Sequence, residues 1–391
     1  MSLKLYEGTY RLVKKVEAGA LAMLMLFSSA FAEEKNVEVA PTTSIVALAG
    51  QQNNSANRFY IGYPEYATKT HEIKKETIAQ RLEEKGATIS YDEKNKITDY
   101  ILNVEGQDCK YRSRTGQFIS DNGRIKCRFF ATDDNLDNIK TVMVIIGGTS
   151  SRGSGEDFSD VALNPGTLIV SCYTGDLKVD TIATADVIAD CTKFVNTAFG
   201  GDKVYNVIGG TSEGSLSAFT IIAKNPGLFQ TLICANGSSY RWGKRDMITA
   251  AAGEEGYKSF NGMEVIFLQS MNNRTGEVDW NEIAIRTIED LKRHGIENIS
   301  FFTSDPPLSK VNPETGETRV ESLVGKENFH YLNAEESKAN GRWGCHGDGI
   351  KMIKKSNVLS YVSSDAHTIA HEVDNGYVVS SQKTQIQARK Q

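Results

Sequence analysis

A serine lies between glycines in the segment GGTSEG, where Gly210, Ser212 and Gly214 form a G-x-S-x-G pattern. The apolar run VYNVIGG precedes this serine, and SLSAFTIIAK, which has helical periodicity, follows it. A serine on so sharp a strand-to-helix turn has a strained backbone and an exposed hydroxyl. The pattern therefore predicts that Ser212 is a nucleophile. The alternatives are a plain glycine-rich turn and an anion-binding loop, although the loop would lack the lysine of the phosphate-binding pattern.

A serine hydroxyl needs a base before it can attack a carbonyl carbon. The chain has six histidines, and His346 stands apart because it lies in GRWGCHGDG, after the last predicted strand and before the last predicted helix. The glycines around it, Gly344, Gly347 and Gly349, let the backbone bend to present the ring. We predict His346 as the general base and keep His330, in a long polar loop, as the reserve.

These side chains must be positioned by elements in which strands alternate with helices. The six continuous apolar runs predicted as buried strands are TVMVIIGG, TLIVSCY, VYNVIGG, FQTLICA, MEVIFLQS and NISFFTS. The helices predicted between and after them are VDTIATADVIADCTKFVNTAFGG, SLSAFTIIAK, DWNEIAIRTIEDLKRHG and DGIKMIKKSNVLSYV. Residues 87–131 are predicted as short antiparallel strands. The pattern predicts an α/β fold, a three-layer α/β/α sandwich with a mostly parallel sheet and antiparallel strands at its N-terminal edge.

With this order of elements, residues 100–363 resemble the α/β-hydrolase superfamily. The resemblance rests on the elbow around Ser212 and on a histidine, His346, that follows the last strand. It implies that the backbone N–H groups of Glu213 and of Gly148 or Thr149 form an oxyanion hole. Fixed donors of this kind are what a developing negative charge requires, and the glycine pair that ends TVMVIIGG allows close approach.

The chain departs from the family in the acid that orients the histidine. The family carries Asp or Glu just after the strand that here reads MEVIFLQS, and this chain has SMNNR there. Asp279 is the first choice, although its spacing to Glu282 is also that of a helix N-cap. Asn272 or Asn273 could orient the imidazole through an amide oxygen, and Asp305 is a further alternative.

The composition limits the class of partner. The chain has 391 residues, 40% of them apolar and 24% charged, and a formal net charge of −5. Without a basic patch, nucleic acid is not expected as a partner. No Cys/His spacing indicates zinc, so neither a metal nor a cofactor is expected. A small-molecule or acylated substrate is the predicted partner, and the sequence carries no prediction of oligomeric state.

The first 32 residues resemble a targeting segment. A basic stretch precedes an uncharged stretch, 18–32, that ends in Ala30-Phe31-Ala32. This stretch is shorter than the roughly 20 residues that span a bilayer. We predict a secretory signal peptide over 1–32, with only transient membrane contact and a secreted, periplasmic or cell-surface protein. An uncleaved anchor helix is the alternative.

Export would permit disulfides among the six cysteines. Cys109 and Cys127 flank two β-like runs around a turn, so they are the predicted pair. The remaining cysteines lie in or beside apolar segments and are predicted as buried thiols: Cys172, Cys191, Cys234 and Cys345.

The rest of the chain divides by composition. Residues 33–57 are predicted as a linker or arm, 58–365 as the hydrolase domain and 366–391 as a polar tail. The long polar stretch 306–342 is predicted as a flap over the site. Trp343, Tyr240 and Trp242 are predicted to line the pocket, with plain packing as the alternative.

Together these features predict a secreted serine hydrolase that cleaves an ester, rather than an amide, through an acyl-enzyme on Ser212. The alternative is a non-catalytic protein of this fold that binds a ligand or partner at the cell surface. The environment of the His346 ring separates the two, because a catalytic histidine needs a carboxylate or amide oxygen within hydrogen-bond reach.

Overall fold

The computed structural model describes residues 67–133, 136–148, 156–173, 181–270, 272–304, 315–339, 343–356, 358–360 and 362. All of them belong to a compact unit that spans 53–391. The predicted signal peptide, the arm and the polar tail lie outside the described residues. No helix in the described ranges is both long enough and apolar enough to cross a membrane.

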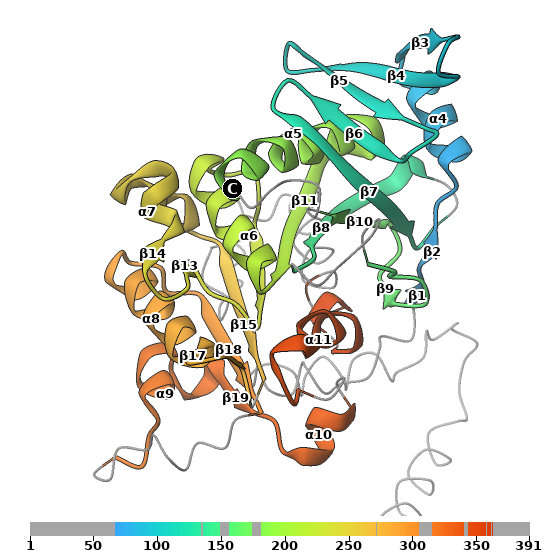
Figure 1. Ribbon diagram of the computed structural model, residues 1–391. Helices are drawn as coiled ribbons and strands as arrows, with labels where there is room; N and C mark the ends of the chain where they lie inside the picture. Colours follow the sequence, from blue (N-terminus) through green and yellow to red (C-terminus); the bar gives the residue numbers. More distant parts are fainter. Residues whose placement is uncertain are drawn as a thin grey trace, which may run out of the picture. The chain divides into compact units, whose positions relative to one another are not determined.

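A mixed sheet organises the described chain, with the strand order β19-β18-β15-β12-β11-β8-β10-β7-β6-β5-β4-β3 and β2 beside β7 (Figure 1). The parallel part comprises β8 (Ile139–Ile146), β10 (Thr167–Tyr173), β11 (Gly200–Thr211), β12 (Thr231–Ala235), β15 (Glu264–Gln269), β18 (Ile299–Thr303) and β19 (Phe329–Tyr331). The antiparallel part comprises β2 (His71–Glu72), β3 (Thr88–Asp92), β4 (Ile97–Val104), β5 (Gln107–Arg112), β6 (Gln117–Ser120) and β7 (Gly123–Ala131). Short two-stranded pairs are β1 (Thr68–Lys69) with β9 (Ala162–Leu163), β13 (Tyr240–Arg241) with β14 (Arg245–Asp246), and β16 (Arg274–Thr275) with β17 (Val278–Asp279).

Helices cover both faces of this sheet. The α-helices are α4 (Lys75–Glu84), α5 (Thr181–Phe199), α6 (Glu213–Lys224), α7 (Met247–Ala252), α8 (Trp280–Arg293), α9 (Arg319–Val324), α10 (Ala334–Ala339) and α11 (Gly349–Lys355). The 3₁₀ turns are η1 (Leu136–Asn138), η2 (Glu254–Phe260), η4 (Lys326–Asn328) and η5 (His346–Asp348).

Two separate hydrophobic clusters show that the sheet is buried from both sides. Alternate residues of β8 join different clusters: Val142 and Val144 belong to the one that includes residues of α5, α6 and α8, whereas Met143 and Ile145 belong to the one that includes residues of α11. A strand buried on both faces needs apolar residues at every position, which explains the continuous run TVMVII. The prediction of a three-layer α/β/α sandwich with an antiparallel N-terminal edge is therefore confirmed, and the chain has the α/β-hydrolase fold.

The strand order places the site at the carboxyl ends of β8 and β11. The chain leaves β8 for β10 on one side and then returns to β11 on the other side, so β8 lies between them. Such a reversal opens a crevice beyond the carboxyl ends of the two neighbouring strands. Gly148 follows β8 and Ser212 follows β11, so both residues lie at this crevice.

Two of the strands that the sequence pattern did not indicate belong to the large sheet and are longer than two residues. One is β5, whose residues QDCKYR alternate too weakly between apolar and polar to mark a strand. The other is β19, in the stretch predicted as a flap, which pairs in parallel with β18 and extends the sheet. The short run FHY gave no signal because the edge strand has only three residues.

The predicted disulfide between Cys109 and Cys127 is wrong. All six cysteines are free thiols, and all except Cys345 are buried. Cys127 instead lies beside two other thiols, with its Sγ 3.8 Å from that of Cys172 and 3.7 Å from that of Cys191. Because β5 and β7 are separated by β6, Cys109 and Cys127 belong to strands that are not neighbours.

Candidate active site

Ser212 occupies the turn between β11 and α6 in a strained conformation. Its φ of 53° and ψ of −116° lie outside the regions that L-residues ordinarily adopt. The turn is fixed by two backbone hydrogen bonds, from Ser212 N to Ala235 O at 3.1 Å and from Ser215 N to Ser212 O at 3.1 Å. The serine is thus the N-cap of a buried helix, where unpaired N–H groups favour negative charge.

The glycines of the elbow are required by close packing. A Cβ on Gly210 would lie 2.4 Å from the backbone of Gly214, and a Cβ on Gly214 would lie 2.3 Å from Ile146 O. Both separations are too short for real Cβ atoms. Strand β11, helix α6 and strand β8 can therefore meet at this turn only because glycine occupies these two positions.

His346 contacts the serine directly. Its Nε2 lies 2.9 Å from Ser212 Oγ, and its Nδ1 lies 2.6 Å from Asn273 Oδ1. Asn273 follows β15, which is the position where the family resemblance placed an acid. The predicted serine–histidine pair is therefore brought together, and the third position is held by Asn273, one of the two asparagines weighed as alternatives.

The neighbours of Asn273 fix which way its amide points. Its Nδ2 donates to Gln269 Oε1 and, at 3.1 Å, to Asn281 Oδ1. Both partners are acceptors, so the nitrogen must face them and the oxygen must face His346. The amide oxygen then accepts from the imidazole Nδ1–H, which leaves the Nε2 lone pair free to accept the serine proton. Asn273 supplies the orientation of a triad carboxylate without its charge.

Asp279, the first choice for the orienting acid, does not face His346, and this assignment is corrected. Its carboxylate caps α8 by accepting from the backbone N–H groups of Asn281 at 3.1 Å and Glu282 at 3.3 Å. It also pairs with Arg274 at 3.1 Å. Of the two interpretations of Asp279, the helix N-cap is therefore the correct one.

The other predicted residues have mixed outcomes. Asn272 is exposed, and its backbone N–H lies 3.3 Å from Gly344 O in the histidine loop. His330, the reserve base, is buried in β19 against Phe302 with ring centroids 4.4 Å apart, and burial lowers its pKa to about 4. Asp305 and Thr149 lie outside the described residues.

The backbone for the predicted oxyanion hole lies close to the serine. A Cβ on Gly148 would be 3.3 Å from Ser212 Cβ and 3.1 Å from Thr211 O. The chain that leaves β8 therefore passes beside the serine. Glu213 begins α6, so its N–H belongs to the first turn and has no partner within the helix. The assignment of Glu213 and Gly148 as oxyanion donors stays a prediction.

Two residues that the sequence did not single out hold the histidine loop. Asn236, buried with a φ of 48°, donates from Nδ2 to Cys345 O at 3.1 Å and His346 O at 3.0 Å. Asp348 Oδ2 accepts from the N–H groups of Gly344 at 3.1 Å and Cys345 at 3.0 Å. A signal for Asn236 existed, since an Asn-Gly pair follows β12 at the same edge as the serine.

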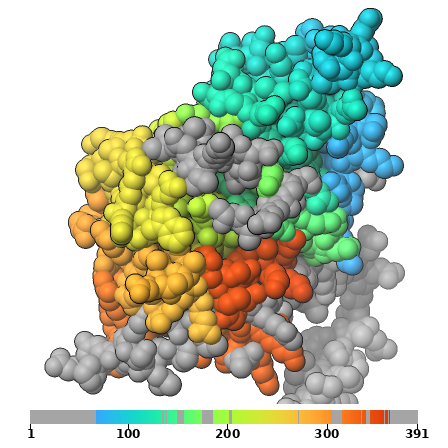
Figure 2. Space-filling view, in the orientation of Figure 1, coloured from blue at the N-terminus to red at the C-terminus, as the bar shows by residue number. Residues whose placement is uncertain are grey.

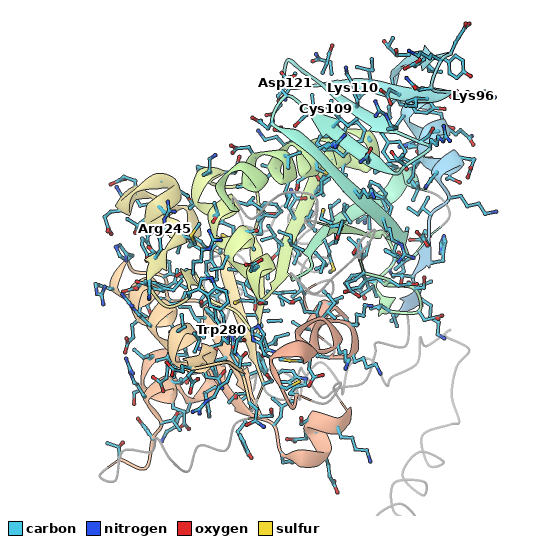
Figure 3. The ribbon with its side chains drawn as sticks, in the orientation of Figure 1. Lys96, Cys109, Lys110, Asp121, Arg245 and Trp280 are labelled. Carbon is cyan, nitrogen blue, oxygen red and sulfur yellow. The ribbon has the colours of Figure 1, made fainter. Side chains whose placement is uncertain are left out.

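A further unpredicted contact is made by Trp280, the first residue of α8 (Figure 3). Its ring stacks on the His346 imidazole with centroids 5.3 Å apart and planes 23° apart. Trp280 is buried, so it shields one face of the base from water. In the sequence this tryptophan counted only as an apolar position of an amphipathic helix.

The three aromatics predicted to line the pocket differ in position. Trp343 is buried in the core, and Ser304 donates to its backbone oxygen at 2.5 Å. Tyr240 is buried and donates its hydroxyl to Asp290. Trp242 is half exposed, and its ring lies 5.9 Å from that of Trp280.

Burial shapes the electrostatics of the site. It lowers the pKa of His346, because the charged imidazolium loses solvation. The neutral form, which accepts a proton, is thereby favoured near neutral pH. Burial also raises the pKa of Glu213, and the positive charge of Arg241 opposes that effect.

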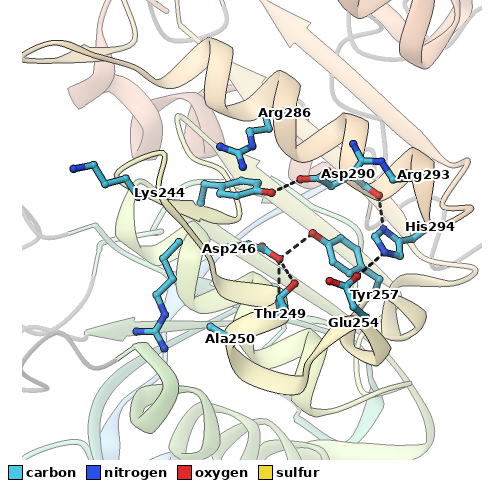
Figure 4. Close-up of a pocket in the computed structure, with 12 residues that line it drawn as sticks. Lys244, Asp246, Thr249, Ala250, Glu254, Tyr257, Arg286, Asp290, Arg293 and His294 are labelled. Atoms are coloured by element: carbon cyan, nitrogen blue, oxygen red, sulfur yellow. Dashed lines mark hydrogen bonds and ion pairs between the residues drawn. The ribbon is translucent and has the colours of Figure 1, made fainter.

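A polar cavity of about 430 Å³ lies between the β13–β14 hairpin, α7, η2 and α8 (Figure 4). Its floor is built from internal hydrogen bonds, such as that from the Tyr257 hydroxyl to Asp246 at 3.0 Å. His294 stacks on Tyr257 with centroids 3.8 Å apart. None of Ser212, His346 and Asn273 lines this cavity, so it is separate from the serine.

No protein-family model matches the chain, and a search of curated proteins finds no match. Among solved structures the chain is similar to prolyl oligopeptidase B from Galerina marginata, with 11% identity, a TM-score of 0.36, and 72% of this chain and 44% of that chain covered. It is also similar to Zea mays acyl-protein thioesterase 2, with 13% identity, a TM-score of 0.32, and 51% and 90% covered. For acetyl xylan esterase 1 from Thermoanaerobacterium sp. JW/SL YS485 the identity is 10%, the TM-score 0.33 and the coverage 68% and 92%. The chain spans less than half of the prolyl oligopeptidase B chain.

Proposed function

We propose that the protein is an exported serine hydrolase that cleaves a carboxylic ester. The observation that carries this proposal is the 2.9 Å contact between Ser212 Oγ and His346 Nε2, on a serine held at a φ of 53°. A strained serine in contact with a half-buried neutral imidazole is what a nucleophile requires. The export rests on the sequence of residues 1–32.

The reaction proceeds in two halves. Ser212 Oγ attacks the ester carbonyl carbon while its proton moves to His346 Nε2, and the N–H groups of Glu213 and Gly148 hold the oxyanion. The bond to the alcohol oxygen then breaks, and the imidazolium gives its proton to that oxygen. A water molecule attacks the acyl-enzyme in the second half, with His346 again taking and returning the proton, so that acid and free serine are released.

The neutral orienting group favours an ester over an amide. An amine leaves only after it is protonated, so amide cleavage depends strongly on a well-stabilised imidazolium as acid. Asn273 gives the imidazolium a hydrogen bond but no negative charge. An alkoxide or phenoxide is a better leaving group, and its departure needs less help from His346.

The first test is labelling of the purified protein with a fluorophosphonate, alongside Ser212→Ala. We expect the wild type to be labelled and the variant to remain unlabelled, with kcat for 4-nitrophenyl acetate reduced about 10⁴-fold or more. The near-isosteric change Ser217→Ala on α6 is the matched control and should keep labelling.

Absence of labelling in a folded wild-type protein would overturn the proposed hydrolase. A non-catalytic binding protein would then be favoured. The amide oxygen 2.6 Å from His346 Nδ1 argues against that alternative, because it gives the imidazole the tautomer that a base needs.

A further inference from the structure

The hairpin of residues 240–246, here called the Trp242 hairpin, brings an exposed tryptophan to the proposed active site. Trp242 contacts Trp280 at 5.9 Å between ring centroids, and Trp280 in turn stacks on His346 at 5.3 Å. These three rings form a continuous row that leads from the base to the surface. In Figure 2 the yellow surface of this part of the chain adjoins the orange surface of α8, and the red surface of α11 lies beside α8.

Trp242 is held in a conformation that its residue type disfavours. Its φ is 52°, that of Gly243 is 68°, and Lys244 N donates to Arg241 O at 3.0 Å. Two successive positive φ angles are typical of a type I′ turn, for which Asn-Gly is the preferred pair. A bulky aromatic residue with positive φ is an outlier, and such outliers cluster at functional sites.

The base of the hairpin is rigid, so the strained turn is held firmly. Tyr240 donates to Asp290, and Arg286 Nη1 donates to Gly243 O at 3.2 Å. Asp246 caps α7 by accepting from the N–H groups of Ile248 at 3.2 Å and Thr249 at 3.0 Å. The exposed face of Trp242 is therefore a preorganised surface, which lowers the entropic cost of binding.

Three cationic residues flank this tryptophan within the hairpin, and two of them, Lys244 and Arg245, line the cavity described above. Arg241, Lys244 and Arg245 lie within three residues of it in the chain, and the latter two are exposed. Within the described ranges, no carboxylate lies at ion-pair distance from any of the three. Arg241 is near enough to the elbow to lower the pKa of Glu213, the residue after Ser212. The hairpin thus offers a flat ring together with unneutralised positive charge.

The row of rings lies on the side where the alcohol leaves. His346 must protonate the departing alcohol oxygen, so the alcohol lies on the same side of the scissile carbonyl as the imidazole. Trp280 covers the imidazole, and Trp242 continues the surface outward. A ring in the alcohol part of the substrate would therefore meet Trp242 first.

From these observations we infer that the Trp242 hairpin is a specificity site for the alcohol part of the substrate, which is a ring that carries an anionic group such as a carboxylate. The ring stacks on Trp242, and its anionic group pairs with Arg241, Lys244 and Arg245. This inference deepens the proposed ester hydrolysis and rests on it for the placement of the alcohol.

The kinetic test compares 4-acetoxybenzoate with phenyl acetate, which differ by one carboxylate on the leaving ring. Each kcat/KM is divided by the rate constant for alkaline hydrolysis, which removes the difference in intrinsic reactivity. We expect the anionic ester to be preferred about 10-fold, and the preference to fall as salt screens the charges.

Two variants separate the parts of the hairpin. Trp242→Asn gives the turn its preferred Asn-Gly pair, so the protein should fold with an unchanged or higher Tm. It should lower kcat/KM for phenyl acetate relative to ethyl acetate by about 3- to 10-fold. The triple change of Arg241, Lys244 and Arg245 to Gln should abolish the preference for 4-acetoxybenzoate.

Matched controls come from the antiparallel edge, far along the sheet order from the serine. Tyr91→Ala removes an aromatic ring that is 58% exposed. The triple change of Lys85, Lys94 and Lys96 to Gln removes the same charge from exposed positions. Both controls should keep the wild-type preferences. Hydrolysis without a preference for the anionic ester, or with a preference that survives the hairpin variants, would overturn the inference and leave the hydrolase intact.

A binding measurement keeps the inference separate from the activity. Binding of 4-hydroxybenzoate, the alcohol product, is followed by ligand-observed NMR on the full chain. Binding that is lost in both hairpin variants supports the site even if no ester is hydrolysed and no fluorophosphonate reacts. No binding to the wild type, or equal binding to the variants, would contradict the inference.

Discussion

At the scale of single residues, Asn273 shows why an amide can replace the usual carboxylate. The side chain faces two acceptor oxygens, of Gln269 and Asn281, on one side and an imidazole N–H on the other. Only a group with one donor end and one acceptor end satisfies both sides. A carboxylate would meet the two oxygens without a proton to share, and a buried group left unsatisfied costs about 1–3 kcal/mol.

The first prediction concerns Asn273→Asp. We expect the free energy of unfolding to fall by about 1–3 kcal/mol, because the new carboxylate faces Gln269 Oε1 and Asn281 Oδ1. Its negative charge should raise the pKa of His346, so the acid limb of kcat/KM should move to higher pH. Urea unfolding and a pH–rate profile measure the two effects. Exposed Asn272→Asp is the matched control, and an unchanged limb in Asn273→Asp would contradict the assigned orientation.

A second prediction concerns the pH dependence of the wild type. Burial lowers the pKa of His346, and no carboxylate contacts the ring within the described residues to raise it. The imidazole is active when neutral, and it becomes protonated only below its pKa. The acid limb of kcat/KM should therefore lie below about 6.5, the ordinary value for histidine. A limb above that value would indicate a carboxylate partner.

The identity of this third residue shows how far the sequence alone can lead. Ser212 and His346 could be predicted because glycine spacing and strand order constrain them locally. The choice between Asp279 and Asn273 depended on which side chain reaches a loop more than 60 residues away. Asp279 carries the charge that a search for an acid favours, yet two N–H groups of α8 already use its carboxylate.

At the scale of elements, the elbow is a meeting point of three backbones. The prediction that tests it is Gly214→Ala, in which the new Cβ would lie 2.3 Å from Ile146 O. Helix α6 must move away from β8 to make room, which carries Ser212 away from His346. We expect loss of fluorophosphonate labelling. The free energy of unfolding should fall by about 3 kcal/mol, the upper end of the usual range for overpacking.

The control for this prediction is Gly347→Ala. Gly347 lies next to His346, but a Cβ there would meet only Cys345 Sγ at 3.9 Å, an ordinary contact. This variant should keep the stability and labelling of the wild type. If Gly214→Ala behaved like Gly347→Ala in thermal unfolding, the close packing at the elbow would be refuted.

Among the elements, those with strong periodicity were predictable and the short ones were not. The apolar run of β8 and the helical pattern of α8 come from burial that repeats along the element. The Trp242 hairpin contains strands of two residues each, so no periodicity exists to detect. Its position at the site follows from contacts with α8 that only the folded chain makes.

At the scale of the whole molecule, the thiols and the predicted export have to be considered together. Export places a chain where disulfides can form, yet all six cysteines are free in the structure. The Cys127 sulfur lies 3.8 Å from that of Cys172 and 3.7 Å from that of Cys191. All three residues are buried among apolar side chains. Burial shields these sulfurs from solvent, so they should react slowly with an external reagent.

The prediction at this scale is therefore a labelling pattern. Iodoacetamide applied to the native protein should modify Cys345 alone, because it is the one exposed thiol among the six, whereas all six should react in denaturant.

Peptide mapping by mass spectrometry after export reads both the thiols and the first residue of the mature chain, which we expect to be Glu33. Since Cys127 can bond with only one neighbour, oxidation would leave one of the three clustered thiols free. A disulfide among these three cysteines in the exported protein would contradict a core that folds with reduced cysteines. Six thiols that react in denaturant, on a chain that begins at Glu33, would show that burial alone protects them.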